Sequence, residues 1–414
     1  LYRLTNADVV LLEEEMKKLE EKIKLYEEIL TNPDKLNSVI KEDLRKIKKE
    51  YGIPRRTEIR EELEEIKVDT TRMIPKEQVV VVVTNEGYIK KVPQRSYNTA
   101  KEEETTLKEN DYVTGLYNIT TTDTLLLFTN LGNYLYLPVY DIPEVKWKEL
   151  GKHISNIISL SPEEKVINSI PVYNFDEERY ITSFTKNGMV KRTLLNEFKV
   201  QRYSKPIKMM NLKGTDEVIS VTDSTLSNVF IATSNGYGLW YDINEVPVVG
   251  IKAAGVKAIS LKDDYVVSGI LFDVASEYLT ILTDKGTAKR MRLTELEKTS
   301  RAKRGILLMK TIKSNPSKII KAYIINSKNQ IGIVSDDYSK IVKLTEISIM
   351  DRYSNGSYII KDRIIDSYIV SELISKEDKE EVTEEIVVEK KQISLSEIDD
   401  KLSNIDSIIK DINE

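Results

Sequence analysis

Pairs of basic residues recur at one place in a repeated sequence pattern. Lys90-Lys91, Lys191-Arg192 and Lys289-Arg290 each stand near the end of a short strand that follows a turn. Lysine and arginine bind phosphate groups through charge-assisted hydrogen bonds. One such pair alone would more often be a solvated strand end. Recurrence favours phosphate binding, because equivalent positions in a closed ring of repeats form a continuous band.

A second basic pattern follows each return strand after the first, at residues 147–152, 202–208, 252–257, 301–305 and 352–356. A DNA duplex carries one charge per about 1.7 Å of its axis, so a basic band suits the duplex backbone rather than the base edges. Together the two patterns predict contacts to nucleic acid. The candidate residues are Lys90, Lys91, Lys148, Lys152, Lys191, Arg192, Arg202, Lys205, Lys208, Lys252, Lys257, Lys289, Arg290, Arg301, Lys303, Arg304 and Lys343.

The composition argues against catalysis by this chain. The sequence has no cysteine, which excludes disulfides, thiolate metal sites and cysteine nucleophiles. Its single histidine, His153, argues against a histidine-dependent triad and excludes zinc sites built from histidine clusters. We therefore predict no catalytic residue and no metal site, and we expect His153 to lie in a partly exposed loop.

The net charge of −5 is unevenly distributed. Residues 74–370 carry 40 basic and 35 acidic side chains, whereas the segments on either side of them are acidic overall. So small an excess is weak evidence for nucleic-acid binding by itself. The prediction therefore depends on where the cations lie.

Short hairpins must position these cations. Residues 79–83 are five valines in a row, and a turn at Asn85-Glu86-Gly87 joins them to a return strand. Copies of this hairpin recur with their turn glycines 45, 56, 48 and 50 residues apart, and a weaker sixth copy has Tyr338 in place of glycine. A period near fifty with several short strands predicts a bladed β-architecture.

Helical sequence precedes the repeats and an acidic segment follows them. Residues 12–30 carry an apolar heptad seam that ends at Asn32-Pro33, and residues 36–47 place apolar side chains on one face of a second helix. Residues 1–67 are therefore expected to form an antiparallel coiled-coil arm with a last helical piece at 57–67. Residues 68–75 are expected to be a linker, 76–372 the repeat domain, and 373–414 an acidic tail, mostly disordered and helical at most in part between 394 and 412. No run approaches the roughly 18 apolar residues of a membrane span. Because the chain begins at Leu1 without a leader sequence, we expect a piece of a longer cytoplasmic protein.

Several stretches resemble the C-terminal part of the A subunits of bacterial type IIA topoisomerases, the family of DNA gyrase and topoisomerase IV. They are residues 1–6, 30–40, 51–59 and 77–92. The resemblance implies that residues 1–67 end the breakage-reunion domain near the dimer gate. It also implies that 76–372 form a DNA-bending β-pinwheel whose blades exchange strands. The expected fold class is therefore mainly β, a propeller-like six-bladed β-pinwheel preceded by an α-helical antiparallel coiled-coil arm.

One position separates the two branches of this family. Gyrase A subunits carry a basic, glycine-rich box after the first return strand, where this sequence has residues 94–104 with no glycine and three glutamates. Residues 147–153 and 250–257 also look like the topoisomerase IV protein (ParC) of Gram-positive bacteria. The resemblance favours the topoisomerase IV branch. A gyrase protein with a degenerate box, or less favourably a protein-binding propeller, stays open as an alternative.

The resemblance also implies what the chain would do and with which partners. It would bind and bend duplex DNA without sequence specificity and present DNA segments for ATP-dependent double-strand passage, in relaxation, decatenation and chromosome segregation. The family's catalytic tyrosine has no counterpart here, and no cofactor is expected in this part. Mg²⁺ and ATP would be used through the partner protein of topoisomerase IV, ParE. The other implied features are a homodimer through the dimer gate, no membrane insertion, and a place at the nucleoid in the bacterial cytoplasm.

Overall fold

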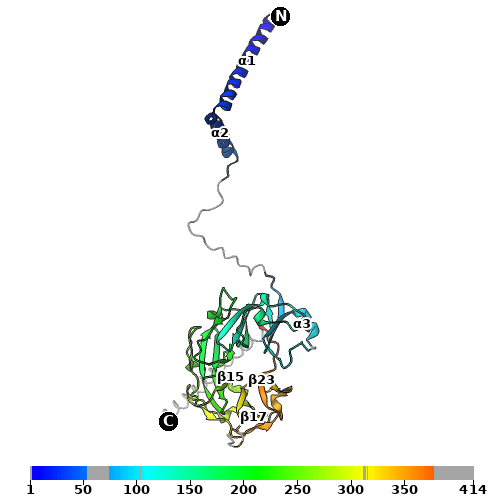
Figure 1. Cartoon of the computed structure of the whole chain (residues 1–414), viewed down its shortest axis with the longest axis vertical. Coiled ribbons are helices and arrows are strands. Elements are labelled where there is room, and N and C mark those ends of the chain that lie inside the picture. The colour runs from blue at the N-terminus through cyan, green and yellow to red at the C-terminus, as the bar shows by residue number, and fades with distance from the viewer. Residues whose placement is uncertain (1, 54–73, 102–103, 311–313, 315, 377–414) are drawn as a thin grey trace, which may run out of the picture. The chain divides into compact units, whose positions relative to one another are not determined.

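The computed structural model describes residues 2–53, 74–101, 104–310, 314 and 316–376 (Figure 1). It divides into two units, Leu1–Val68 and Asp69–Glu414, which we describe separately. Among the described residues, no helix combines the length and the apolar character that crossing a membrane would require.

The first unit contains two helices, α1 (Tyr2–Thr31) and α2 (Pro33–Tyr51). Asn32 caps α2, because its side-chain oxygen accepts a hydrogen bond from the backbone N–H of Asp34 at 3.0 Å, and Pro33 suits the first helical turn. The expected helical piece at residues 57–67 lies outside the described residues.

The predicted N-terminal helices are confirmed, and their antiparallel coiled-coil packing stays a prediction, because this unit leaves both apolar seams exposed. Leu12 in the α1 seam is 64 % exposed and Leu44 in the α2 seam is 59 % exposed, and no residue of α2 is buried. A helical hairpin needs a connection of about 2–5 residues, whereas Asn32 is the single non-helical residue between α1 and α2. Both apolar seams therefore stay uncovered within the unit.

The second unit is a propeller of six antiparallel sheets, which confirms the predicted mainly β, six-bladed fold (Figure 1). Each blade is built on a hairpin and one further, inner strand. The first three blades contain β1 (Gln78–Thr84), β2 (Tyr88–Pro93) and β3 (Val113–Thr120), then β4 (Thr124–Thr129), β5 (Asn133–Pro138) and β7 (Val166–Val172), then β8 (Tyr180–Thr185), β9 (Met189–Leu194) and β11 (Val218–Thr222). The next three contain β12 (Asn228–Thr233), β13 (Tyr237–Asp242) and β15 (Val266–Phe272), then β16 (Tyr278–Thr283), β17 (Thr287–Arg292) and β19 (Ile319–Tyr323), then β20 (Gln330–Ser335), β21 (Ser339–Lys343) and β23 (Ile364–Ile369).

Five blades receive a short fourth strand from the next repeat, so the blades exchange strands as the resemblance implies. These outer strands are β6 (Lys152–His153), β10 (Ile207–Lys208), β14 (Val256–Lys257), β18 (Ile306–Leu307) and β22 (Ser357–Tyr358), on blades 1 to 5 in order. Each lies in a longer stretch that crosses to the preceding blade after the hairpin and a short 3₁₀ turn. We call these stretches the exchange segments: residues 146–153, 201–210, 250–260, 299–310 and 349–360.

The sixth blade differs from the others. Its sheet has three strands among the described residues, with β21 at the outer edge. Its turn is also shifted by one residue from the prediction: Val334 pairs with Ser339 as Leu282 pairs with Ala288 in blade 5. Asp337, not Tyr338, therefore occupies the place of the turn glycine.

The ring is closed where blade 6 meets blade 1. The backbone N–H of Ile374 donates to the Leu116 carbonyl at 3.0 Å and its carbonyl accepts from Asn118 at 2.8 Å, so the chain after β23 runs along β3. The ring of Tyr112 stacks on Tyr368 with centroids 3.7 Å apart. The residues after β23 thus hold blade 6 against blade 1 and close the ring of blades.

Among the described residues, a buried hydrophobic cluster joins each pair of consecutive blades from blades 1 and 2 to blades 5 and 6. The first cluster joins Val81 and Ile89 of blade 1 to Leu125 and Leu135 of blade 2, all at most 1 % exposed. The alternation of strand side chains places one face of every sheet against the next, so the blades stack around an axis.

Candidate nucleic-acid interface

The first lysine of each basic pair lies inside the domain. Lys90, Lys191 and Lys289 are 2 %, 1 % and 2 % exposed, respectively. This contradicts the exposed band that the sequence predicts for them. We call these three residues the clamp lysines.

Backbone carbonyl groups surround the clamp lysines. Nζ of Lys289 donates to the carbonyls of Leu308 at 2.7 Å, Asp351 at 2.9 Å and Arg352 at 2.7 Å. Leu308 belongs to one exchange segment, whereas Asp351 and Arg352 belong to the next. The ammonium group therefore ties two successive exchange segments to the return strand of blade 5.

The same arrangement recurs in blade 3, whereas in blade 1 the lysine binds two carbonyls of a single exchange segment. Nζ of Lys191 donates to the carbonyls of Met209 and Ile251, again in successive exchange segments. Nζ of Lys90 donates to the carbonyls of Trp147 at 2.6 Å and Glu149 at 2.5 Å. In blades 2 and 4 the equivalent residues are Leu135 and Leu239, which are buried in the cores between blades.

Burial of the clamp lysines gives the stability of the domain a specific pH dependence. Removal from water lowers the pKa of Lys191 to about 8 from an ordinary value of 10.5, although the Glu197 carboxylate opposes this shift. The pKa values of Lys90 and Lys289 fall to about 8 for the same reason. Above pH 8 the folded protein releases these protons first while the unfolded chain still holds them, so the free energy of unfolding rises with pH.

We expect that rise to be measurable between pH 8 and pH 9 in urea unfolding experiments. Each clamp lysine contributes up to about 1 kcal/mol over this interval, from the difference between its folded and unfolded pKa. The Lys191→Met variant should therefore gain about 1 kcal/mol less than the wild type between the two pH values. Equal gains would show that Lys191 keeps its proton in the folded domain across this range.

The second residue of each basic pair also binds backbone carbonyls. Nζ of Lys91 donates to the Tyr140 carbonyl at 2.9 Å, and Nε of Arg290 donates to the Ile347 carbonyl at 2.9 Å. Lys91 and Arg290 are buried, each 8 % exposed. The acceptors lie in or next to the 3₁₀ turns that begin each crossing, so these side chains hold neighbouring blades together.

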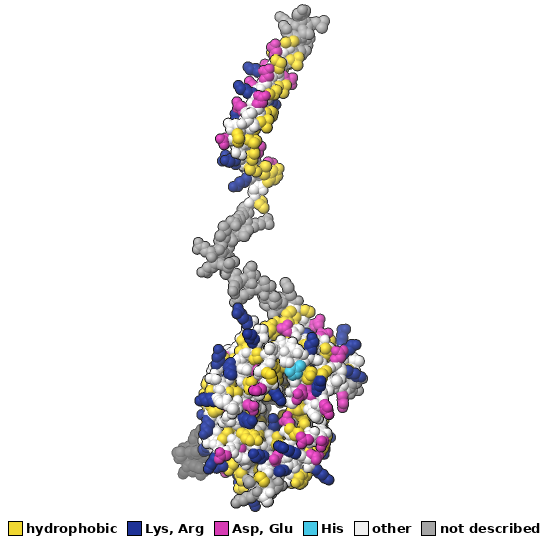
Figure 2. Space-filling view, in the orientation of Figure 1, with side chains coloured by type: hydrophobic (Ala, Val, Ile, Leu, Met, Phe, Trp, Pro, Cys, Tyr) yellow, Lys and Arg dark blue, Asp and Glu magenta, His cyan; other side chains and the backbone are white. Residues whose placement is uncertain are grey.

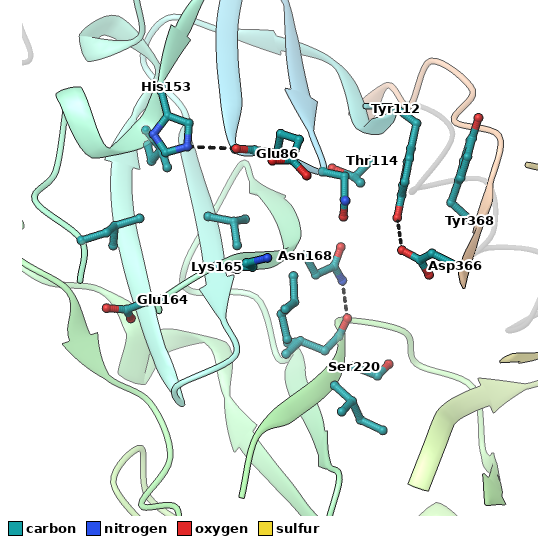
Figure 3. A pocket seen from close by; sticks show the side chains of 18 of the residues that line it. Glu86, Tyr112, Thr114, His153, Glu164, Lys165, Asn168, Ser220, Asp366 and Tyr368 are labelled. Carbon is teal, nitrogen blue, oxygen red and sulfur yellow. Dashed lines mark hydrogen bonds between the residues drawn. The ribbon is translucent and has the colours of Figure 1, made fainter. Parts of the chain in front are cut away.

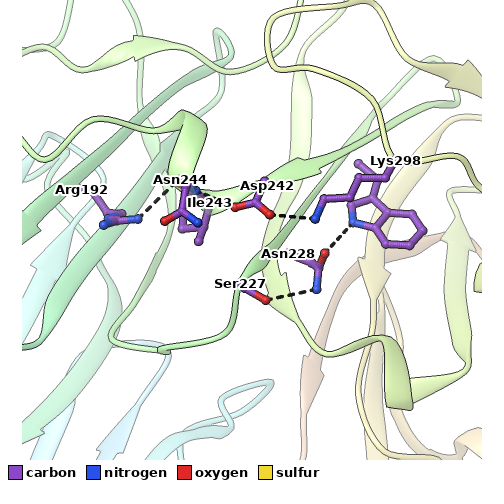
Figure 4. A network of polar contacts seen from close by, with 8 residues as sticks. Arg192, Ser227, Asn228, Asp242, Ile243, Asn244 and Lys298 are labelled. Carbon is purple, nitrogen blue, oxygen red and sulfur yellow. Dashed lines mark hydrogen bonds and ion pairs between the residues drawn. The ribbon is translucent and has the colours of Figure 1, made fainter. Parts of the chain in front are cut away.

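Arg192 is the half-buried member of this group. Nη1 of Arg192 donates to the Ile243 carbonyl at 3.2 Å (Figure 4). Its guanidinium also lies 4.5 Å from the ring centre of Tyr180. Nearby, Lys298 pairs with Asp242 at 2.8 Å, which fastens the following exchange segment to blade 4. The basic pairs thus act between blades, and we remove Lys90, Lys91, Lys191, Arg192, Lys289 and Arg290 from the candidate interface.

The remaining candidates lie mainly on the exchange segments, at the outer edges of the blades. We call the exposed members of this set the outer-edge cations. They are Lys148 and Lys152 on blade 1, Arg202, Lys205 and Lys208 on blade 2, Lys252 and Lys257 on blade 3, and Lys303 and Arg304 on blade 4. Lys and Arg side chains, in dark blue, stand along much of the outline of this unit in Figure 2.

The last two candidates are placed differently. Lys343 is exposed on β21 of blade 6. Arg301 is half-buried: its Nε donates to the Glu245 carbonyl at 2.9 Å, and its Nη1 donates to the Lys257 carbonyl in the preceding exchange segment. Arg301 therefore links two exchange segments, with little of its side chain left for a ligand.

Tight turns allow the exchange segments to lie close to the return strands. Gly255 has φ of 81°, and a Cβ atom there would stand 2.5 Å from the Val190 carbonyl oxygen. Gly305 has φ of 80°, and a Cβ atom there would stand 2.2 Å from the Gly238 carbonyl oxygen. Any residue with a side chain would push the outer strand away at these two places.

Three carboxylates that the sequence analysis did not identify hold the first residues of three exchange segments in place. The carboxylates of Glu197, Glu245 and Glu295 accept hydrogen bonds from the backbone N–H groups of Ile251 at 2.8 Å, Arg301 at 2.7 Å and Arg352 at 2.8 Å. Each glutamate stands nine residues after its turn glycine. That constant spacing is the signal by which they could have been found.

A different element occupies the position at which gyrase A proteins carry their box. Residues Gln94–Ala100 form the helix α3, and Thr105 and Thr106 donate to the carbonyls of Trp147 at 2.8 Å and Lys148 at 2.6 Å. Tyr97 of α3 also packs edge-on against Trp147, with ring centres 5.0 Å apart. This segment therefore folds back over the outer edge of blade 1.

A cavity of about 810 Å³ opens near the axis, beside the contact between blades 6 and 1 (Figure 3). The Tyr112 hydroxyl donates to Asp366 at 2.7 Å, and Nε2 of His153 lies 2.9 Å from the Glu86 carbonyl. These polar groups are thus hydrogen-bonded within the protein. His153 is half-buried in β6 rather than in a loop, and no cluster of acidic and histidine side chains suited to a metal is found in the part of the chain that the structure describes.

Comparison with known proteins gives a family for this architecture. The family model described as "DNA gyrase C-terminal domain, beta-propeller" matches residues 78–101, 123–172, 179–222, 227–272 and 277–326. These ranges correspond to the first five blades.

Two relatives match most of the chain. The A subunit of DNA topoisomerase 4 from Bacillus subtilis (strain 168) is 43 % identical over 365 residues, which cover 87 % of this chain and 45 % of that protein. The protein of the same name from Staphylococcus aureus (strain MRSA252) is 39 % identical over 378 residues, which cover 89 % of this chain and 47 % of that protein. The chain thus spans a little under half the length of these relatives.

Two solved structures are similar to the propeller. The crystal structure of a C-terminal domain of DNA topoisomerase IV is 40 % identical with a TM-score of 0.69, over 72 % of this chain and 94 % of that one. The C-terminal domain of a DNA gyrase A is 18 % identical with a TM-score of 0.54, over 71 % of this chain and all of that one. The second likeness shows the fold alone.

Proposed function

This chain belongs to the C-terminal-domain family of bacterial type IIA topoisomerase A subunits, on the topoisomerase IV side, and from that premise we propose that its propeller binds duplex DNA along its outer edge. The observation that carries this proposal is the placement of the outer-edge cations. Exposed Lys and Arg recur on the exchange segments of four successive blades. Such side chains neutralise phosphates and release counterions, which supplies affinity independent of base sequence.

A duplex bound along the outer edge would also be bent, because this edge is curved. A duplex that contacts several blades in succession must follow the outline of the ring, because the cations stand on its circumference. Bending a duplex costs free energy that depends on its deformability, and the extra contacts offset that cost. DNA bent in this way would be presented for ATP-dependent double-strand passage, in relaxation and decatenation of the bacterial chromosome.

The proposal assigns the chemistry to other parts of the enzyme. Catalytic strand cleavage belongs to a domain absent from this chain, and Mg²⁺ and ATP belong with ParE, the partner protein in topoisomerase IV. The described residues offer no cluster that fits a metal, so no step is assigned to one here. Homodimerisation through the dimer gate and a place at the nucleoid in the bacterial cytoplasm complete the proposal.

Linear duplexes of unrelated sequence test this function. The chain should bind them with similar affinities, and the logarithm of the association constant should fall linearly with the logarithm of salt concentration, with a slope near −0.9 for each phosphate contacted. Ligation of bound DNA into small circles should speed up if the edge bends it. No binding at about 50 mM salt, where such contacts are strong, would contradict the proposal and favour a protein-docking propeller.

The fold-back at residues 94–106 separates this proposal from the gyrase alternative. Blade 1 has α3 and the threonines that contact residues 147 and 148 where a gyrase would have a basic, glycine-rich box. The whole enzyme should therefore relax and decatenate DNA without introducing negative supercoils. ATP-driven negative supercoiling would establish the gyrase alternative.

A further inference from the structure

Among the described residues, the outer edge of blade 6 is the one blade edge without a fourth strand. Blades 1 to 5 each have a fourth strand from an exchange segment, whereas β21 has none among the described residues. Ile341 on β21 is 56 % exposed, and Lys340 and Lys343 beside it are exposed as well. An exposed strand edge offers unpaired backbone N–H and C=O groups to an incoming strand.

Lys340 occupies the position of the clamp lysines and makes one of the two kinds of contact seen in blades 3 and 5. The strand register places Lys340 where blade 5 has the clamp lysine Lys289. Nζ of Lys340 lies 3.4 Å from the Ile359 carbonyl, which corresponds to the contact of Lys289 with Leu308 in the preceding exchange segment. Lys289 also binds two carbonyls of the following exchange segment. Blade 6 has no following segment in the described part of the chain.

The C-terminal sequence contains a stretch that continues the repeat. Lys289, Lys340 and Lys391 are spaced 51 residues apart, and so are Glu295, Glu346 and Glu397. Leu395-Ser396-Glu397-Ile398 repeats the Leu344-Thr345-Glu346-Ile347 of the 3₁₀ turn in blade 6. Residues 391–398 thus have the spacing and the residue types of a seventh half-repeat.

A sequence like that of an exchange segment follows, two residues nearer to Glu397 than its counterpart lies to Glu346. Residues 403–411 read Ser-Asn-Ile-Asp-Ser-Ile-Ile-Lys-Asp, and residues 354–362, which include the outer strand of blade 5, read Ser-Asn-Gly-Ser-Tyr-Ile-Ile-Lys-Asp. The two agree at six of nine positions without a gap. Ile405 replaces the turn glycine, as Pro206 does in the exchange segment of blade 2, so glycine is not required there.

We propose that residues 403–411 of this chain dock on β21 as the sixth exchange segment. In blade 5, Thr287 pairs with Tyr358 and Ala288 with Ser357. The same register places Ser407 opposite Tyr338 and Asp406 opposite Ser339. The backbone that leads into the docked segment, at residues 400 and 401, then supplies Lys340 with the carbonyls that Lys289 receives from Asp351 and Arg352, and the ring has six four-stranded blades.

Length and charge favour this occupant. The described chain ends at Lys376, after Ile374 pairs along β3 next to blade 6. The segment between Lys376 and Ser403 is about 27 residues long and spans up to roughly 90 Å when extended, whereas crossing a four-stranded blade takes about 15–20 Å. Residues 377–414 carry 13 acidic and 5 basic side chains, which complements the two exposed lysines of β21.

A disulfide between engineered cysteines tests the register. The chain has no cysteine, so Tyr338→Cys with Ser407→Cys introduces the only thiols. Under mild oxidation of the full chain, this pair should form an intramolecular disulfide at least about tenfold faster than the matched pair Tyr338→Cys with Ser394→Cys, read by proteolysis and mass spectrometry. Equal rates for the two pairs would overturn the proposal. Disulfides formed only between chains would also overturn it, in favour of a second copy as the occupant.

Hydrogen exchange gives an independent measurement without new thiols. The backbone amides of Ser339 to Ile341 should exchange at least about tenfold faster in the double variant Ile408→Asp with Ile409→Asp than in the wild type, because they lose a paired strand. Amides of β12 in the distant blade 4 serve as the internal reference. Unchanged exchange at β21 would show that the segment does not dock there, whatever the outcome of DNA binding.

Discussion

Replacing Lys205, Lys208, Lys252 and Lys257 together by alanine should lower the affinity for linear duplex by roughly 10²-fold or more at low salt, because each removed phosphate contact contributes to counterion release. The slope of log K against log salt should become shallower by about 3.6, which is about 0.9 for each of the lost contacts. All four side chains are exposed on the exchange segments of blades 2 and 3. Fluorescence anisotropy over a salt series measures both quantities.

A charge-matched variant controls for the change in net charge. Replacing Lys165, Lys285, Lys318 and Lys328 by alanine removes the same four charges from exposed sites outside the exchange segments. We expect this variant to keep most of the affinity and nearly all of the salt slope. If the two variants weaken binding equally, the domain attracts DNA by its overall field and the outer edge is not a defined path.

The spacing of the hairpins explains why the number of blades could be predicted from the sequence. A glycine with φ between 73° and 91° lies in the turn of each of the first five hairpins. The strand before each turn is buried on both faces. Backbone conformation and burial both restrict residue type at these places, so the pattern survives in the sequence. In blade 6 the restriction is relaxed, because Asp337 replaces glycine, and there the predicted register was wrong by one residue.

The prediction that the basic pairs are exposed was wrong, because the segments that bury them are distant in the sequence. Lys289 and Arg290 point to opposite faces of β17, and each face is covered by chain 57–63 residues further on. A signal was nevertheless present. Leu135 and Leu239 take the place of the clamp lysines in blades 2 and 4, and apolar residues at equivalent positions indicate an interior site.

The outer-edge cations were predicted for a sounder reason. Their segments are rich in basic residues, include a turn glycine on blades 1, 3 and 4, and have no strong apolar alternation, which is typical of exposed loops. The structure brings them to the outer strands of blades 1 to 4, an arrangement that depends on strand exchange and that periodicity could not indicate. Their contact with DNA stays a prediction.

Lys289→Met should lower the free energy of unfolding by about 2–4 kcal/mol, because it breaks a buried polar network. The substitution leaves the carbonyls of Leu308, Asp351 and Arg352 without their shared donor in a buried place. Hydrogen bonds to a charged group contribute about 1.5–3 kcal/mol each. Burial of the ammonium lowers its pKa to about 8, which corresponds to a cost of about 3 kcal/mol. The methionine variant no longer has this cost. The hydrogen bonds outweigh the relief, so the variant is less stable, as urea unfolding at pH 7 would measure.

Lys343→Met provides the matched comparison, because Lys343 is a strand lysine whose side chain is exposed. Surface substitutions of this kind usually change stability by less than about 0.5 kcal/mol. The ammonium of Lys289 joins two exchange segments, so its loss should also speed hydrogen exchange in β18 and β22 together, while exchange in β6 stays unchanged. A Lys289→Met variant as stable as Lys343→Met would mean that the carbonyls find other donors and that blade-to-blade cohesion comes from the apolar cores instead.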